Sequence, residues 1–230
     1  MLKADLHLHT CFSCDSHTAP LDIVERCLEE GINCLAVTDH GQIEGALAVA
    51  ELAPFKVIVG EEVLTPQGEI IGLFLSKKIP SPCSPWEAVK EIKRQGGLVI
   101  IPHPFDSLRS TALKESALNE LVREAVVDAI EVLNGRVILA KHNKAAAKFA
   151  QQNSLPATAG SDSHRLDEIG KVYLQMPDYQ TPQEFLQSLS QAQIIDRRGR
   201  YFGIRAGALW ERATNRKEAR KSREYAKCIE

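Results

Sequence analysis

The chain of 230 residues is long enough for one large α/β domain with a full core. Its hydrophobic content of 44% and charged content of 25% are typical of globular proteins, and no apolar run approaches the roughly 20 residues of a membrane span. Six scattered cysteines do not form the dense framework of a small secreted disulfide protein. We therefore expect reduced thiols, no signal peptide, no membrane partner and a cytoplasmic location.

The net charge of −2 is unevenly distributed along the chain. Residues 197–230 hold eleven Lys and Arg against four Asp and Glu, a net charge of +7, which leaves −9 for residues 1–196. The acidic part suits a site built from carboxylates. We expect the basic extension, which also carries apolar and aromatic residues, to pack on the rest of the protein. Nucleic-acid binding by the extension is the alternative.

Short apolar strands alternate with amphipathic helices through the first 190 residues. The pattern predicts strands over 2–9, 34–40, 56–63, 69–75, 98–103, 128–134 and 156–162. It predicts helices over 20–30, 43–52, 85–95, 113–124, 139–152 and 182–191. This order indicates parallel strands with right-handed crossovers in a single domain over 1–230, with a barrel in 1–196 and the extension in 197–230.

The third and fourth predicted strands break the alternation. Only residues 64–68, Leu-Thr-Pro-Gln-Gly, separate them, which is too short for a helical crossover and suits a hairpin. In a hairpin, Glu62 and Glu69 lie near one another across the ladder. Two like charges there would repel unless a cation lay between them, so this pair favours a metal site.

Polar residues that can bind metals recur at the carboxyl ends of the predicted strands. His7 and His9 alternate with two leucines, so both imidazoles point to one face of the first strand. The other residues are His40, Glu62, His103 and Asp162, followed by His164. In a barrel these strand ends form one rim, where residues from different strands converge. We favour a barrel over a doubly wound open sheet, which also places ligands at strand ends.

The ordered motifs of this chain resemble those of a known family. They are Asp5-Leu6-His7-Leu8-His9-Thr10, Thr38-Asp39-His40, Gly60-Glu61-Glu62, Pro102-His103-Pro104 and Gly160-Ser161-Asp162-Ser163-His164. The set resembles the PHP (polymerase and histidinol phosphatase) superfamily, and most of all its small stand-alone phosphoesterases. The resemblance implies an α/β fold with a distorted seven-stranded, TIM-like (β/α) barrel. It also implies a trinuclear divalent metal site that hydrolyses phosphate esters through a metal-activated water.

The resemblance further implies which residues hold the metals. The first ion would be bound by His7, His9, Glu62 and Asp162. The second ion would share Glu62 and take His103. Glu69 stands where many members have a histidine that binds the second ion, so the substitution keeps a ligand and adds negative charge. The resemblance thus implies two to three Mn, Fe or Zn ions.

The third ion would be bound by His40, His164 and one residue from the loop after the first strand. That loop reads Ser13-Cys14-Asp15-Ser16-His17, where many family members read Ser-Asp-Gly. Asp15 is its only carboxylate, so we assign Asp15 to the third ion, with His17 and Cys14 as weaker substitutes.

Other residues are candidates for steps around the metals. His40, Asp39 or solvent would protonate the leaving group, and Asp39 alternatively orients a neighbour. Arginines that follow the motifs are candidates to bind phosphate oxygens of a small phosphorylated substrate: Arg109, Arg136, Arg165 and Arg205. The sequence leaves the identity of that substrate and the oligomeric state open.

Several residues are interpreted as supporting the site or as unrelated to it. Asp5, Glu131 and Asn134 are candidates to orient ligands. His142 is predicted to lie on the surface of its helix. The pair Cys11-x-x-Cys14 is interpreted as loop thiols, since the chain has no second such pair to complete a zinc site.

Two other functions compete with phosphoester hydrolysis. An amidohydrolase also begins with two alternating histidines on a barrel strand, but it usually bridges its metals with a modified lysine on a middle strand. No lysine ends a predicted strand here. A non-catalytic, metal-binding regulatory protein is the second rival, and loss of ligands would indicate it.

Overall fold

The structure is a computed structural model, and it describes residues 1–198. Its strands are β1 (Leu2–Asp5), β2 (Cys34–Val37), β3 (Lys56–Thr65), β4 (Gly68–Leu73), β5 (Leu98–Ile101), β6 (Ala129–Asn134), β7 (Ala157–Gly160), β8 (Val172–Met176) and β9 (Gln193–Asp196). Its helices are α1 (Pro20–Glu30), α2 (Glu44–Leu52), α3 (Pro85–Arg94), α4 (Glu115–Arg123), α5 (Ala140–Gln152) and α6 (Pro182–Leu189), with a 3₁₀ turn at Leu166–Glu168.

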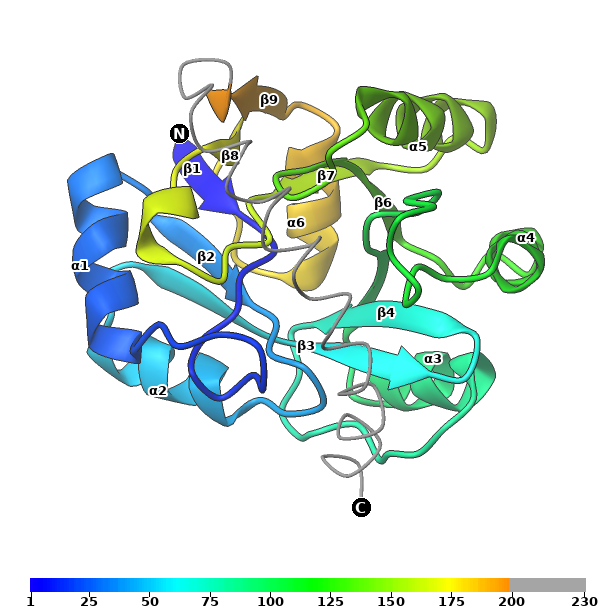
Figure 1. The fold of residues 1–230 in the computed structure, drawn as a ribbon, viewed down its shortest axis with the longest axis horizontal. Coiled ribbons are helices and arrows are strands. Elements are labelled where there is room, and N and C mark those ends of the chain that lie inside the picture. Colours follow the sequence, from blue (N-terminus) through cyan, green and yellow to red (C-terminus); the bar gives the residue numbers. More distant parts are fainter. Residues whose placement is uncertain (199–230) are drawn as a thin grey trace.

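The described strands form one sheet that curls into a nearly closed barrel (Figure 1). Their order is β7-β6-β5-β4-β3-β2-β1-β8-β9. Neighbouring strands are parallel from β1 to β3 and from β5 to β7. β4 runs antiparallel to both β3 and β5, and it joins β3 through the predicted hairpin. The predicted barrel fold is therefore confirmed.

The barrel closes through the residues that follow β1. The Leu6 amide donates to the Ala159 carbonyl at 3.3 Å, and the His9 amide donates to the Ser163 carbonyl at 2.9 Å. Leu8 and Ser163 also form a parallel bridge. β8 instead pairs antiparallel with residues 2–4 of β1. One edge of the first strand is thus divided between two partners.

The structure adds two strands to the seven that the sequence pattern predicts. β8 and β9 form an antiparallel pair beside β1, which a βα repeat does not anticipate. The predicted strand over 2–9 ends at Asp5, and the residues after it continue the barrel through the bonds described above. The expected packing of the basic extension falls almost wholly on residues 199–230, which lie outside the described part.

Local sequence signals fix several helix ends. Ser84 caps α3 in a capping box with Glu87, and Pro85 occupies its first turn. Thr181 caps α6 by accepting a hydrogen bond from the amide of Glu184. α1 ends at Gly31, whose φ of 70° is the left-handed conformation that favours glycine.

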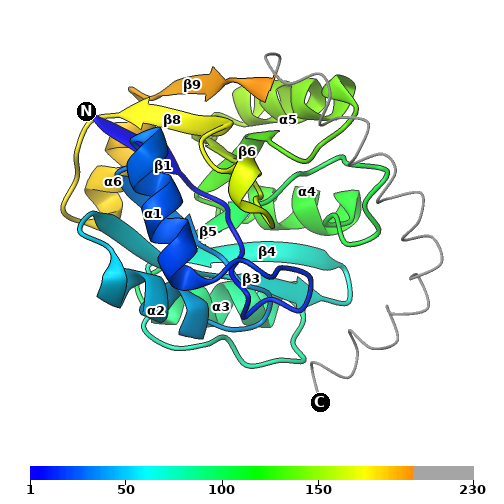
Figure 2. The same cartoon turned by 60° about the vertical axis from the view of Figure 1, so that its left-hand side comes forward.

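Helices α1 to α5 cover the outside of the barrel (Figures 1 and 2). One outer cluster joins α1 and α2 to the outward side chains of β2 and β8, for example Leu35 and Tyr173. A second joins α3, α4 and α5 to outward side chains of β5 and β6, for example Val99 and Ile130. No helix among residues 1–198 has the length and apolarity needed to cross a membrane.

The third cluster fills the inside of the barrel. It contains inward side chains such as Ala36, Ile58 and Ala129, together with the fully buried Phe185 of α6. The Phe185 ring contacts the ring of Tyr179 at a centroid distance of 5.1 Å. This apolar filling leaves the carboxyl ends of the same strands for polar residues.

Candidate metal centre

The structure brings all nine predicted metal ligands together at the carboxyl end of the barrel. They fall into four overlapping groups, in each of which the ligand atoms lie within 4.8 Å of one another. The groups are His9, Asp15, His40 and His164; His7, His103 and Asp162; His7, His9 and Glu62; and His40, Glu62 and Glu69. The two predicted substitutes for Asp15, Cys14 and His17, belong to none of these groups within residues 1–198.

Glu62 lies at the centre of the cluster. Its Oε2 lies 3.4 Å from His7 Nε2, 3.3 Å from His9 Nε2 and 3.3 Å from His40 Nδ1. Its Oε1 lies 3.0 Å from His103 Nε2. Burial raises the pKa of Glu62, but the neighbouring His7, His40 and His103 outweigh it and hold the pKa well below its ordinary value.

His7 and His9 direct ring nitrogens at one point. Their Nε2 atoms are 3.1 Å apart, and Asp162 Oδ1 lies 3.5 Å from the first and 3.4 Å from the second. That Asp162 oxygen is buried and accepts no hydrogen bond from the described residues. Two facing imidazole nitrogens beside a carboxylate oxygen with no donor make a binding site for a cation.

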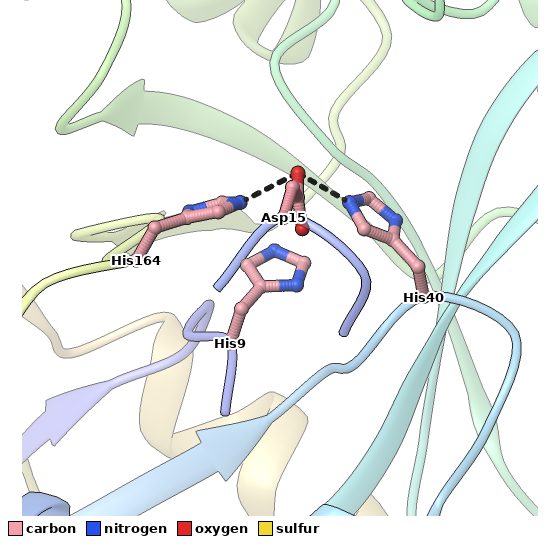
Figure 3. Close-up of side chains that lie close together, drawn as sticks. All are labelled: His9, Asp15, His40 and His164. Carbon is pink, nitrogen blue, oxygen red and sulfur yellow. Dashed lines mark hydrogen bonds and ion pairs between the residues drawn. The ribbon is translucent and has the colours of Figure 1, made fainter. Parts of the chain in front are cut away.

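Asp15 forms a second group of candidate ligands with histidines from the segments after β1, β2 and β7 (Figure 3). Its Oδ2 lies 3.0 Å from His164 Nε2 and 3.4 Å from His40 Nε2, and His9 lies in the same group. These histidine contacts hold the pKa of Asp15 below its ordinary value, although burial alone would raise it. The loop carboxylate therefore lies where the third ion was expected.

Glu69 reaches the cluster from the neighbouring strand of the hairpin. It pairs with Leu64 in the ladder, which places it on the same face as Glu62. Its Oε2 lies 3.6 Å from His103 Nε2, and its Oε1 lies 3.8 Å from His40 Nδ1. Burial, and then the charge of Glu62, raise the pKa of Glu69.

Glu61 points to the other face of β3. Its Oε2 accepts a hydrogen bond from the Ile79 amide at 2.7 Å, and the side chain is buried. Burial raises the pKa of Glu61 to about 7. Only one of the two adjacent glutamates therefore faces the histidines.

Glu131 contacts two of the candidate ligands, His7 and His103, through atoms that do not face the cluster. Its Oε1 lies 3.1 Å from His7 Nδ1, and its Oε2 accepts from the His103 amide at 2.7 Å. Asn134 donates both to Glu131 Oε2 at 3.0 Å and to Asp162 Oδ2 at 3.1 Å. The orienting roles considered for Glu131 and Asn134 match this geometry.

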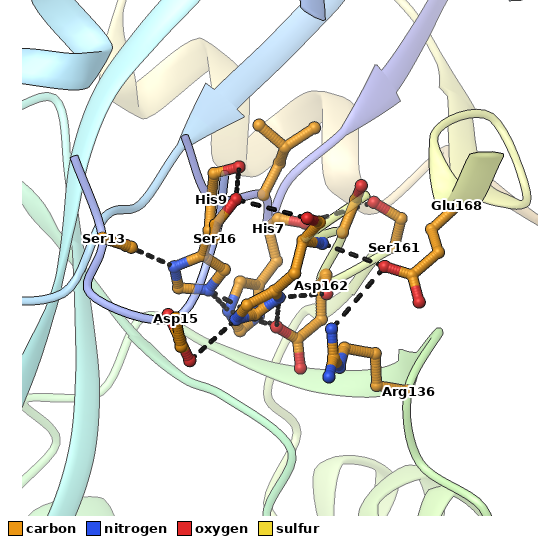
Figure 4. A network of polar contacts seen from close by, with 12 residues as sticks. His7, His9, Ser13, Asp15, Ser16, Arg136, Ser161, Asp162 and Glu168 are labelled. Carbon is orange, nitrogen blue, oxygen red and sulfur yellow. Dashed lines mark hydrogen bonds and ion pairs between the residues drawn. The ribbon is translucent and has the colours of Figure 1, made fainter. Parts of the chain in front are cut away.

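Asp39 lies behind the cluster and does not face it. Ser13 joins the two, because its hydroxyl lies 3.1 Å from His9 Nδ1 (Figure 4) and donates to Asp39 Oδ1 at 2.9 Å. The Thr10 amide and hydroxyl also donate to Asp39, each at 2.7 Å. The geometry thus favours the orienting interpretation of Asp39 over proton donation to a leaving group.

Asp5 also has a role in holding the chain. Its Oδ1 accepts from the Ser161 amide at 2.8 Å and lies 3.5 Å from the His7 amide, and no described imidazole nitrogen donates to it. Burial raises the pKa of Asp5 to about 7. Asp5 therefore ties β1 to the segment after β7.

The four candidate phosphate-binding arginines lie in different places. Arg109 contacts the cluster directly, because its Nη2 lies 2.5 Å from Asp162 Oδ2. Arg136 pairs with Glu168 at 3.6 Å beside the cluster (Figure 4). The side chain of Arg165 is 55% exposed and pairs with Asp167. Arg205 lies outside the described residues.

The surface position predicted for His142 is wrong. His142 is 6% exposed, and its Nδ1 lies 3.1 Å from Oδ1 of the buried Asp106. The prediction followed polar neighbours such as Lys141 and Lys144 along the helix. It missed the contact because the loop after β5, with Asp106 lying 36 residues before His142 in the sequence, covers this part of α5.

The comparisons with known proteins agree with this fold. Residues 5–71 match the PHP domain family, and residues 140–194 match the PHP-associated family. The chain is 37% identical to the uncharacterised protein MJ1587 of Methanocaldococcus jannaschii over 146 residues, covering 58% of this chain and 82% of that one. It is 34% identical to the uncharacterised protein MJ0417 of the same organism over 197 residues, covering 82% and 79%.

More distant relatives carry names that refer to nucleic acid or phosphoesters. A 5'-3' exoribonuclease of Haemophilus influenzae is 29% identical over 125 residues, covering 48% of this chain and 45% of that one. A solved two-domain protein of Bacteroides vulgatus contains a predicted PHP-like metal-dependent phosphoesterase. It superposes with a TM-score of 0.70 at 20% identity, covering 85% of this chain and 64% of its own length. Together, the family matches and the M. jannaschii relatives show that this chain belongs to the PHP family.

Proposed function

We propose that this protein is a metal-dependent phosphoesterase that hydrolyses a small phosphorylated substrate at a trinuclear site. The observation that carries the proposal is the fixed direction of three imidazoles. The Nδ1 atoms of His7, His9 and His164 each lie within 3.1 Å of an oxygen outside the metal groups or on the backbone: Glu131 Oε1, Ser13 Oγ and the Asp162 carbonyl. With a proton on each Nδ1, every Nε2 keeps its lone pair toward the cluster.

The residues present fit divalent ions. The carboxylates and the histidine nitrogens supply the mixed oxygen and nitrogen ligands that Mn, Fe and Zn accept. His7, His9, Glu62 and Asp162 would hold one ion. Glu62, Glu69 and His103 would hold a second, and Asp15, His40 and His164 a third. When bound, such ions lower the pKa of water and neutralise charge on a phosphoryl group.

Protein groups around the ions would position the substrate. Arg109 offers a guanidinium at the edge of the cluster, where its remaining N–H groups can bind a phosphate oxygen. Asp39 is engaged by Thr10 and Ser13, and His40 is assigned to an ion. The proton for the leaving group would therefore come from solvent.

The first experiment measures metal content and hydrolysis together. Elemental analysis of the purified full chain should find about two to three equivalents of Mn, Fe or Zn. A panel of phosphomonoesters and phosphodiesters should reveal an activity that a chelator removes and added metal restores. Less than about one equivalent of metal after reconstitution, or hydrolysis that survives the chelator, would contradict the proposal.

The substrate class needs a separate comparison, because the partial match to an exoribonuclease favours nucleic acid as the second candidate. We propose a small phosphoester as the substrate and packing on the barrel as the role of the extension. Truncation after Asp196 should then lower the melting temperature more than it changes substrate preference. Steeply salt-dependent binding of an oligoribonucleotide that disappears on truncation, with normal hydrolysis of small substrates, would favour a nucleic-acid arm.

A further inference from the structure

A second set of reactive side chains lies beside the metal centre, on the loop between β5 and α4. Ser107 Oγ lies 3.2 Å from His142 Nε2, and His142 Nδ1 lies 3.1 Å from Asp106 Oδ1. Asp106 and His142 are buried, at 1% and 6% exposure, whereas Ser107 is exposed. None of the three belongs to the metal-ligand groups found among residues 1–198.

An ionised Asp106 sets the direction of the hydrogen bonds in this set. An ionised carboxylate only accepts, so His142 Nδ1 carries a proton and donates it to Asp106. His142 Nε2 then keeps its lone pair and accepts from the Ser107 hydroxyl. This is the order of nucleophile, base and orienting acid that activates serine in unrelated hydrolases.

The backbone of the loop holds the set in place. The Leu108 amide donates to Asp106 Oδ1 at 3.2 Å, and the Arg109 amide donates to the Asp106 carbonyl at 3.0 Å. Phe105 has a φ of 66°, which is rare for a residue with a side chain and persists only where the surroundings enforce it. The sharp turn keeps Asp106 inside while the next residue, Ser107, faces solvent.

The charges around the set suit a base that gains a proton. Asp106 Oδ2 is buried and accepts no hydrogen bond from the described residues, so its charge remains available to stabilise an imidazolium at His142. Arg109 Nε lies 4.0 Å from the same oxygen. The exposed side chain of Leu108, at 55%, offers an apolar contact next to Ser107.

We propose that Ser107, with His142 as its base and Asp106 as the orienting acid, is a second nucleophilic site that acts on small carboxylic esters. Ser107 Oγ attacks the carbonyl carbon while its proton passes to His142 Nε2. The alkoxide of the ester leaves with that proton, and an acyl group remains on Ser107. Water then attacks the acyl carbon, His142 takes a proton from the water, and the proton returns to Ser107 as the carboxylic acid departs.

Covalent labelling tests this site independently of the metal centre. The full-length protein is treated with an alkyl fluorophosphonate, which transfers its phosphonyl group to an activated serine as fluoride leaves with the proton. Peptide mass spectrometry then locates the adduct, and hydrolysis of p-nitrophenyl acetate is followed in parallel. We expect one dominant adduct at Ser107, and ester hydrolysis that persists in a chelator that removes phosphoester hydrolysis.

Matched variants decide the assignment. Ser107→Ala should lose the adduct and the ester hydrolysis, whereas Ser110→Ala, an exposed serine of the same loop, should retain both. His142→Gln should slow labelling by on the order of 100-fold, which is the usual contribution of a general base. Ser107 is exposed, so its variant tests the proposal even if His142→Gln fails to fold. An unlabelled protein, or equal labelling and hydrolysis in Ser107→Ala, would overturn the proposal.

Discussion

The two ends of the barrel interior are built from the same strands but from opposite kinds of side chain. On β2 and its continuation the inward residues run from Ala36 to His40, and on β3 they run from Ile58 to Glu62. The amino end is filled by apolar residues around Phe185. The carboxyl end holds buried histidines and carboxylates.

This difference separates the residues that stabilise the fold from the candidate metal ligands. Apolar burial at the amino end is favourable by itself, at roughly 25 cal/mol per Å². Buried carboxylates at the carboxyl end cost free energy unless cations or hydrogen bonds compensate them. We therefore expect the stability of the carboxyl end to depend on bound ions, and that of the amino end to be independent of them.

The largest effect is expected from Glu62→Gln. The change removes a charge that faces four histidines, so metal content should fall by at least one equivalent. Phosphoester hydrolysis should fall by more than about 100-fold, the upper range for loss of an outer partner. Elemental analysis and initial rates measure both. Full metal content in this variant would show that Glu62 is not a ligand.

A smaller effect is expected from Glu131→Gln. The amide can still accept from the His103 backbone, but it no longer fixes the Nδ1 proton of His7 by charge. Metal affinity should fall by about 10–100-fold, as for other outer partners of histidine ligands. Titration with a competing chelator measures it, and Glu51→Gln on the surface of α2 is the control. A loss as large as that of Glu62→Gln would place Glu131 among the ligands.

Phe185→Ala tests the apolar end. Removing this buried ring should lower the free energy of unfolding by about 3–5 kcal/mol and the melting temperature by roughly 10 °C. The metal content of the folded protein should stay unchanged, since the ring lies in the apolar cluster. Leu166→Ala, at a position 38% exposed, is the control. Metal loss at a temperature where the variant is folded would show that the two ends are coupled.

The smallest effect on activity is expected from Glu61→Gln, next in sequence to Glu62. Because burial raises the folded pKa of Glu61 from 4.5 to about 7, the unfolded chain ionises first, and wild-type stability falls as the pH rises between these values. Glutamine carries no charge and avoids this loss. The melting temperature of the variant relative to wild type should therefore be higher at pH 8 than at pH 5, with near-normal metal content. An equal difference at both pH values would contradict the raised pKa.

Much of the fold follows from local patterns in the sequence. The Pro-Gln-Gly turn predicts the hairpin, and strand alternation predicts that Glu62 and Glu69 share a face. The motifs that resemble the PHP family select residues that the structure brings together. These features can be predicted because each depends on a few neighbouring residues and on the regular geometry of strands.

Other features depend on contacts between distant segments and escape sequence patterns. β8 pairs antiparallel with β1, although the two strands lie far apart in the sequence. The βα order of the preceding elements predicts a parallel strand at this place. His142 is buried by a loop that its own helix does not predict. The Asp39 carboxylate accepts hydrogen bonds from Thr10 and Ser13 because the loop after β1 folds back over it. No sequence pattern at residue 39 predicts these contacts.

The divided edge of β1 has a consequence for biosynthesis. The residues after β1 complete the barrel only when β7 and the segment after it are present, and His164 and Asp15 meet across 149 residues of chain. Contacts so distant in sequence form late and slow folding. During translation, the amino-terminal histidines must therefore wait for almost the whole barrel to leave the ribosome. Loading of the proposed metal centre would thus be a late event, dependent on the ions available to a nearly finished chain.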